Sequence, residues 1–280
     1  ASFSATADII IKRIDLYLNK FKIKTINNIM EKSKRRDYNK EFIEKKYTMV
    51  RSIIEKDAIK ELRESINKML KKHEFVDGNN PYITNKKRKA YNMYSMLIME
   101  HTLNTDAPES YKKKKELILG EVYGEIIKPL EEELSMIFYL IRIQYWRVIG
   151  MTYMEIYEGS PAQEVHQDSP EGMNRIFITI PLENTSKEMG PTVFYDERII
   201  NKYRTKSDRD KNKMGNIGYY KDMKGDKKAA FEKGRVQYEL EEGDITIHRD
   251  VTYHNGGENK TNKTRKFLFL VCDYTDRLRR

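Results

Sequence analysis

Residues 243–265 read GDITIHRDVTYHNGGENKTNKTR, and this stretch guides the interpretation of the rest of the chain. Gly243 and Asp244 open a short apolar strand, and His254 follows eleven residues after Gly243. Arg265 stands eleven residues after His254 and begins the next apolar strand. A rigid guanidinium at such a place can pair with a carboxylate through two hydrogen bonds. The stretch therefore predicts strands that carry an imidazole and an anion-binding arginine.

A second motif lies upstream, where His166 and Asp168 follow a strand and a turn at residues 159–161. In an extended segment, residues i and i+2 point to the same side, so both side chains can reach one metal ion. His254 from a distant strand would complete a face of two histidines and one carboxylate, which leaves the opposite metal positions open, as non-heme iron(II) oxygenases require. The same ligands also suit zinc. A similar triplet occurs at residues 248–250, and we interpret His248 as a structural strand residue.

The chain on both sides of these motifs is rich in strand patterns. Runs of apolar and β-branched residues predict strands at 141–148, 151–157, 174–182, 192–195, 236–240, 245–248 and 266–274. Between them lies a polar insert at about 196–233, dense in Lys, Asp, Gly and Asn. Long irregular inserts in compact domains are usually either functional lids or disordered. We predict that this one is mobile without substrate and closes over the metal.

The first half of the chain has a different pattern. Apolar residues at helical spacing predict helices at about 7–34, 41–72, 86–103 and 111–139, the last kinked or broken at Pro129. Broad apolar helix faces must be buried, and the strand-rich half offers the nearest surface. The sequence therefore predicts an α+β protein, with a helical region at 1–140 packed on a strand-rich core at 141–280.

Charge and composition narrow the class of protein further. Residues 1–150 carry 30 Lys and Arg against 21 Asp and Glu, whereas residues 151–280 carry 23 against 22. A basic half indicates either a solvated lysine-rich surface or an acidic partner such as nucleic acid. The only cysteine is Cys272, so no intrachain disulfide can form. We find no membrane span and no secretory signal in the sequence, and cytoplasmic is the expected location.

The ordered motifs resemble a known family. An H-x-D triplet, a strand beginning Gly190-Pro191-Thr192, a Gly-Asp pair, and a histidine with an arginine eleven residues later occur in that order. This pattern is similar to the phytanoyl-CoA dioxygenase-like branch of the iron(II)- and 2-oxoglutarate-dependent oxygenases. The resemblance covers about residues 141–276 and implies a double-stranded β-helix, the jelly-roll or cupin-like barrel, with iron near its mouth.

The resemblance also implies roles for individual residues. His166, Asp168 and His254 match the family's catalytic iron ligands, and Arg265 matches the residue that holds the far carboxylate of 2-oxoglutarate. In the family, O2 and 2-oxoglutarate give succinate and CO2 while a substrate is hydroxylated. An aspartate at position 168, rather than a small residue, favours hydroxylation over halogenation.

This sequence departs from the family pattern near the cosubstrate. A small hydroxyl residue is common two positions after the distal histidine, and here that residue is Gly256. We expect Thr261 to supply the hydroxyl instead. On the strand before the H-x-D triplet, Tyr153 and Tyr157 are candidate cosubstrate contacts, although packing inside the protein is the alternative. Residues 196–198 also replace the Pro-Gly-Ser-His turn that family members commonly have.

Two other classes of function remain open at this stage. One is a catalytically silent binding module that keeps the fold. The other is a protein that binds or modifies nucleic acid through its basic half, where residues 86–89 form a dense basic cluster. For the oxygenase, a small molecule or a protein side chain is the favoured substrate. The sequence predicts no membrane partner and does not fix the oligomeric state.

Overall fold

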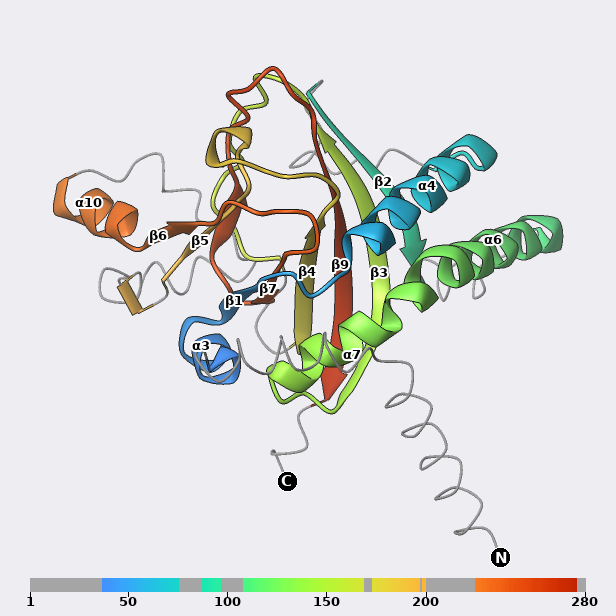
Figure 1. Ribbon diagram of the computed structural model, residues 1–280, viewed down its shortest axis with the longest axis horizontal. Coiled ribbons are helices and arrows are strands. Elements are labelled where there is room, and N and C mark those ends of the chain that lie inside the picture. The colour runs from blue at the N-terminus through green and yellow to red at the C-terminus, as the bar shows by residue number, and fades with distance from the viewer. Residues whose placement is uncertain are drawn as a thin grey trace, which may run out of the picture. The chain divides into compact units, whose positions relative to one another are not determined.

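A computed structural model describes residues 37–75, 87–96, 108–168, 173–196, 198–199 and 225–275 (Figure 1). The chain has two structural units, and the elements below belong to the second one, Asn39–Arg280, apart from the first residue of α3. The helix predicted at 7–34 and most of the predicted insert at 196–233 lie outside the described residues.

A six-stranded antiparallel sheet forms the larger layer. In spatial order its strands are β1 (Tyr47–Val50), β7 (Ile245–Arg249), β4 (Arg175–Pro181), β9 (Arg265–Thr275), β3 (Tyr145–Ile156) and β2 (Arg88–Ser95). β-Branched and aromatic residues are frequent in these strands because their side chains pack well on a pleated surface. The long central pair of β3 and β9 extends from Tyr145 opposite Thr275 to Ile156 opposite Arg265, with one register shift between Val148 and Gly150.

A three-stranded antiparallel sheet forms the smaller layer. Its order is β6 (Arg235–Gln237), β5 (Thr192–Tyr195) and β8 (His254–Gly256). Phe194 of β5 connects the two sheets, since its ring stacks on Tyr47 of β1 at 4.8 Å between ring centroids and lies 5.5 Å from the ring of His248. The other face of the small sheet is covered by Phe231 of α10 (Gly225–Lys233).

The helices come mainly from the first half of the chain. They are α3 (Tyr38–Lys45), α4 (Lys56–Lys72), α6 (Glu109–Val122) and α7 (Glu131–Leu140), with a π turn at Tyr123–Ile127, a 3-10 turn at Lys128–Leu130 and another at Lys187–Met189. The break expected at Pro129 is confirmed. Helix α4 buries Ile59, Leu62, Ile66 and Met69, and Phe138 of α7 stacks on Trp146 of β3 at 4.6 Å.

Two helix predictions are wrong in part. The helix expected at 41–72 is interrupted by β1, because Lys46 takes a positive φ of 66° that ends α3. The helix expected at 86–103 is instead strand β2 over Arg88–Ser95, which pairs with β3. Tertiary pairing overrides local helix propensity at both places. The predicted boundary at residue 140 stays a prediction, and two strands of the large sheet lie before it.

Most of the strand predictions are confirmed. The strand expected at 236–240 is shorter and begins one residue earlier, as β6 at Arg235–Gln237. The strands expected at 141–148 and 151–157 are a single strand, β3, whose register shifts between Val148 and Gly150. The strands expected at 174–182, 192–195, 245–248 and 266–274 correspond to β4, β5, β7 and β9. Within the described part of the chain, no helix is long and apolar enough to cross a membrane.

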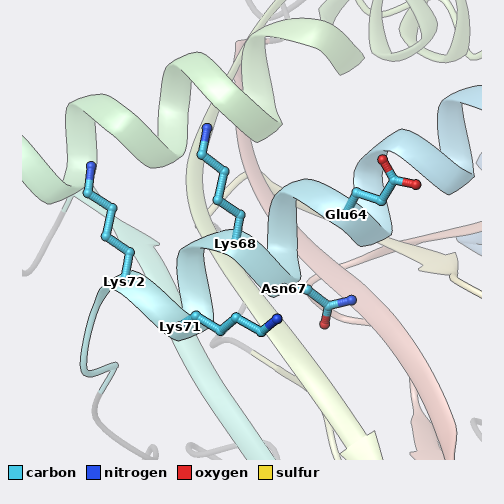
Figure 2. A pocket seen from close by; sticks show the side chains of 5 residues that line it. All are labelled: Glu64, Asn67, Lys68, Lys71 and Lys72. Carbon is cyan, nitrogen blue, oxygen red and sulfur yellow. The ribbon is translucent and has the colours of Figure 1, made fainter.

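Part of the basic first half is paired with acidic groups. Figure 2 shows a hollow on α4 lined by Glu64, Asn67, Lys68, Lys71 and Lys72, with Lys68 and Lys72 pointing toward the neighbouring helix. Lys68 Nζ lies 3.1 Å from Glu125, and Lys72 Nζ lies 2.7 Å from Glu121. These two lysines are therefore neutralised within the fold.

Candidate metal centre

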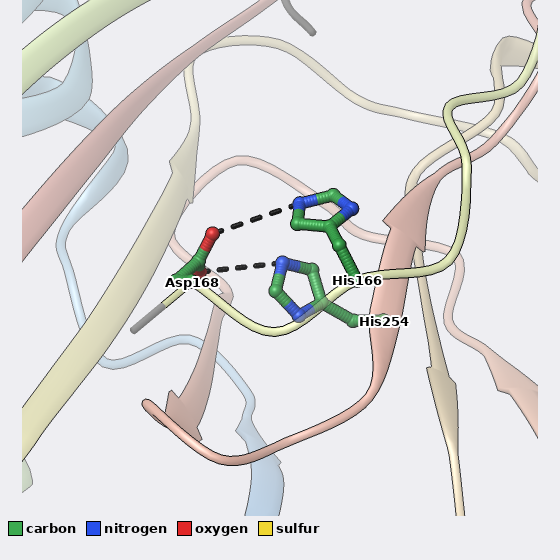
Figure 3. A group of neighbouring side chains, drawn as sticks. All are labelled: His166, Asp168 and His254. Carbon is green, nitrogen blue, oxygen red and sulfur yellow. Dashed lines mark ion pairs between the residues drawn. The ribbon is translucent and has the colours of Figure 1, made fainter. Parts of the chain in front are cut away.

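Three predicted ligands meet at one point. His166, Asp168 and His254 each offer a ligand atom, and these atoms lie within 4.8 Å of one another (Figure 3). The Nε2 atom of His166 is 3.6 Å from Oδ1 of Asp168, and the Nε2 atom of His254 is 3.3 Å from Oδ2. The structure thus brings together two residues of the segment after β3 with one residue of β8.

Backbone pairing explains why the two histidines are neighbours. His166 and His254 form an isolated antiparallel bridge, with N–H to O distances of 2.9 and 3.0 Å. Side chains directly opposite each other in an antiparallel pair lie close together, and the two rings are 4.5 Å apart between centroids. The bridge therefore sets the spacing of the two imidazoles.

The imidazole rings of His166 and His254 are both oriented with Nε2 facing Asp168. Nδ1 of His166 lies 2.7 Å from the carbonyl oxygen of Glu164, and Nδ1 of His254 lies 3.0 Å from that of Thr252. A carbonyl can only accept, so Nδ1 carries a proton in each ring, and Nε2 is the nitrogen that remains to bind a metal. Metal-binding histidines are commonly oriented in this way.

Electrostatics keep Asp168 ionised. Burial alone would raise the pKa of Asp168, but the charge of His254 and hydrogen bonds from the surrounding histidines hold that pKa well below its ordinary value. For His166 burial acts to lower the pKa, and the hydrogen bond and charge of Asp168 raise it above its ordinary value. An ionised carboxylate next to two imidazoles is a set of donors that attracts a divalent cation.

A fourth side chain, His248, belongs to this cluster. Sequence reasoning treated it as a structural strand residue, yet its Nε2 atom lies 3.0 Å from Oδ2 of Asp168 and the side chain is fully buried. Its ring stacks on Phe177 at 5.3 Å between centroids. Burial lowers the pKa of His248 to about 4, so the ring is neutral at pH 7 and donates Nε2–H to the carboxylate. The alternation of Ile245, Thr246, Ile247 and His248 was the available signal for an inward imidazole.

We expect His248→Phe to weaken metal binding without abolishing it. Phenylalanine keeps the ring stacked on Phe177 but loses the hydrogen bond that orients Asp168. Loss of such a partner typically costs 10–100-fold in metal affinity, and we expect roughly that effect by metal titration. His73→Phe is the control, since His73 pairs with Glu121 on another part of the fold. Equal affinity in the His248 and His73 variants would show that His248 does not position Asp168.

Arg265 lies on the sheet face that carries His248. Side chains alternate along a strand, so Arg265, Phe267 and Phe269 share one face of β9, and the ring of Phe269 is 6.2 Å from that of His248. Arg265 is buried, and its Nη1 donates to the carbonyl of Met189 at 3.3 Å. Its Nε has no hydrogen-bond partner among the described residues. Burial, aided by the charge of Arg88, lowers the pKa of Arg265 to about 9.

The other residues predicted to contact the cosubstrate, which are Tyr153, Tyr157 and Thr261, use their hydroxyls in other contacts. Tyr153 is opposite Leu268 of β9. Leu268 is an odd number of residues from Arg265, so the side chains of Leu268 and Tyr153 lie on the other face of the sheet from Arg265. The hydroxyls of Tyr153 and Tyr157 both donate to Glu155, at 2.8 and 2.5 Å. The structure therefore does not bring either tyrosine to the metal ligands. Thr261 uses its hydroxyl within its own loop, 2.8 Å from Oδ1 of Asn259.

Two antiparallel sheets with a cluster of two histidines and one carboxylate are typical of non-heme metal enzymes. The chain belongs to the phytanoyl-CoA dioxygenase (PhyH) family, whose model matches residues 44–267. With the triad, membership of this family makes iron and 2-oxoglutarate the cofactors of the site. The resemblance predicted from the motifs is confirmed, and the match also covers much of the helical half. A comparison with curated protein sequences finds no significant match.

Solved structures share the fold at low sequence identity. The 2-oxoglutarate-dependent epimerase SnoN of nogalamycin biosynthesis has a TM-score of 0.57 and 14% identity, covering 84% of this chain and 81% of its own. HygX from Streptomyces hygroscopicus, solved with nickel and 2-oxoglutarate, has a TM-score of 0.53 and 9% identity, covering 86% and 87%. The carbocyclase SnoK has a TM-score of 0.52 and 14% identity, covering 86% and 84%. At these identities the likeness shows the fold.

Proposed function

We propose that this protein is an iron(II)- and 2-oxoglutarate-dependent dioxygenase that hydroxylates its substrate. The observation that carries the proposal is the convergence of His166, Asp168 and His254, whose free ring nitrogens and ionised carboxylate suit iron(II). The buried guanidinium of Arg265 on the same sheet face supports it, since a buried cation with an unpartnered donor suits a carboxylate.

The arrangement of the two sheets supports a finer description of the fold. We propose that they form the two halves of a double-stranded β-helix, the jelly-roll barrel of cupin-like proteins. In that arrangement the described helices between Asn39 and Leu140 pack on the outside of the barrel. Phe194, which contacts both sheets, then lies in the interior between them.

The residues of the site have two roles, binding of the metal and binding of the cosubstrate. His166, Asp168 and His254 would hold the iron, and Arg265 would pair with the far carboxylate of 2-oxoglutarate and orient it. When bound, iron would let O2 oxidise both substrates: one oxygen atom would enter succinate as 2-oxoglutarate loses CO2, and the other would become the hydroxyl on a carbon of the substrate.

Apolar side chains line the surface beside Arg265. Ala90, Met154, Ile156 and Phe267 form a buried cluster, with Phe269 packed against it. Exclusion of water strengthens the attraction between a guanidinium and a carboxylate. It also limits side reactions of the oxidant. The cluster therefore suits a site in which a charged cosubstrate is buried during turnover.

The fold accommodates more than one type of oxidation, since SnoN is an epimerase and SnoK a carbocyclase on the same fold. Asp168 would fill the ligand position that a small residue would leave for a halide, which favours hydroxylation over halogenation. Hydroxylation of a small molecule or of a protein side chain is the outcome that we propose.

Succinate formation tests the reaction. The protein is incubated with iron(II), ascorbate and 2-oxoglutarate in air, alone and with panels of small molecules and peptides. We expect succinate to form only when iron(II) and O2 are present, and to increase with a substrate whose mass rises by one oxygen atom. No succinate under any condition would instead favour a silent binding module.

A further inference from the structure

Two buried arginines, Arg88 and Arg265, lie in one row of directly opposite residues across the large sheet. Arg88 of β2 is opposite Ile156 of β3, and Ile156 is opposite Arg265 of β9. Directly opposite residues project from the same face, so both arginines face the interior that carries His248. Adjacent strands are about 4.8 Å apart, which puts the two arginine Cα atoms about 10 Å apart. Both residues are 4% exposed.

The hydrogen-bond partners of these two arginines are neutral. Arg88 donates from Nε to Oγ of Ser160 at 2.7 Å and from Nη2 to the carbonyl of Pro161. Arg265 donates from Nη1 to the carbonyl of Met189. Across the described ranges, neither guanidinium forms a salt bridge with a carboxylate. Burial of a cation costs free energy unless an opposite charge compensates it, so this pair is suited to a bound anion.

The two charges also act on each other. Burial lowers the pKa of Arg88 to about 10, and the pKa of Arg265 is lowered first by burial and then by the charge of Arg88. Arg88 therefore acts electrostatically on the proposed cosubstrate arginine, from the same row of the sheet. A single anion near both guanidiniums would relieve their repulsion.

Because Gly256 has no side chain, the guanidinium of Arg88 has room beside it. A Cβ atom at this position would lie 3.2 Å from Nη1 of Arg88 and 2.6 Å from Oε1 of Gln163. The amide of Gly256 donates to the same Gln163 oxygen at 2.8 Å. Gly256 is the position, two residues after His254, where related sequences are expected to carry a small hydroxyl. In this protein a guanidinium nitrogen fills that place.

We propose that Arg88 and Arg265 together hold the far carboxylate of 2-oxoglutarate, and that Arg88 replaces the hydroxyl contact missing at Gly256. This inference rests on the proposed function and adds a second cation to the cosubstrate site. It replaces Thr261 in the role expected from the sequence. Two guanidiniums on one carboxylate select a dicarboxylic keto-acid over a keto-acid that has only one carboxylate.

The first test is calorimetric binding of 2-oxoglutarate to nickel-loaded protein. We expect Arg88→Gln to weaken binding ten- to a hundredfold, because the charge-assisted hydrogen bond is lost while a donor for Ser160 remains. Nickel affinity should not change. Arg63→Gln is the control, since Arg63 also donates to a backbone carbonyl, at 2.6 Å from Leu182, away from this row. An affinity of Arg88→Gln within twofold of the parent protein would overturn the inference.

A shorter ligand locates the contact. 2-Oxobutyrate keeps the keto-acid end and lacks the far carboxylate. We expect Arg88→Gln and the parent protein to bind it equally, whereas they differ for 2-oxoglutarate. Equal weakening of both ligands would show that Arg88 does not act at the far carboxylate, and would overturn the inference.

A double variant tests whether Arg88 replaces a hydroxyl at position 256. In the parent protein, Gly256→Ser must displace Arg88 or Gln163 and should weaken 2-oxoglutarate binding. In the Arg88→Ala background the space is open, and the same substitution should strengthen binding relative to Arg88→Ala alone. The same change in both backgrounds would contradict this replacement, because coupled positions give non-additive effects. If even the parent protein binds no 2-oxoglutarate, the proposed function fails as well.

Discussion

Asp168→Ala is expected to lose bound iron(II) and turnover together. Among the described residues, Asp168 is the carboxylate that lies next to both candidate histidine ligands, at 3.6 Å from Nε2 of His166 and 3.3 Å from Nε2 of His254. Its loss removes the charge that attracts the cation and leaves two imidazoles that also repel each other when protonated. The fall in iron affinity should exceed the roughly 10–100-fold typical of losing a residue that only orients a ligand. Iron content after anaerobic reconstitution and succinate formation measure the two effects.

The second H-x-D triplet, at residues 248–250, supplies a matched control. Asp250 lies in the look-alike sequence at 248–250, is buried, and accepts a backbone hydrogen bond from Val251. Asp168→Asn should lose iron, whereas Asp250→Asn should keep it. His166→Ala is expected to behave as Asp168→Ala does. Full iron occupancy with full activity in either alanine variant would show that the ligand assignment is wrong.

Arg265→Ala should weaken 2-oxoglutarate binding by about 2–3 kcal/mol while iron stays bound. That loss corresponds to roughly a 30- to 140-fold rise in Kd. The reason is the loss of a charge-assisted pair at a buried site, where alanine also leaves a cavity. Calorimetry with nickel-loaded protein measures the change, and Arg147→Ala, whose side chain is 62% exposed, is the control. An unchanged Kd would remove Arg265 from the cosubstrate site.

Local patterns were enough to predict that His166, Asp168 and His254 lie close together. His166 and Asp168 share a side because residues i and i+2 of an extended segment do so, and the spacing from Gly243 to His254 and Arg265 marked two further strands. The strands at 174–182 and 192–195 were predicted because β-branched residues are dense in them. In these cases the sequence neighbourhood and the final structure favour the same conformation.

Features that depend on strand pairing could not be predicted from these patterns. Arg88 stands in a run of basic residues that is typical of a solvated helix start, and only pairing of β2 with β3 shows that it is buried. The contact of His248 with Asp168 requires a segment 80 residues away to cross the end of β7. The face on which Tyr153 lies depends on the register between β3 and β9. Register is set by long-range packing, so one sequence read locally does not contain it.

The most direct test of the central claim is absorbance under anaerobic conditions. Iron(II) is added to the protein first, and 2-oxoglutarate is then titrated in. Chelation of iron(II) by the keto-acid end should produce a visible charge-transfer band that saturates at one cosubstrate per chain. The band should be absent in Asp168→Ala and should require more 2-oxoglutarate in Arg265→Ala. A parent protein that binds iron(II) but gives no band at any 2-oxoglutarate concentration would contradict the account.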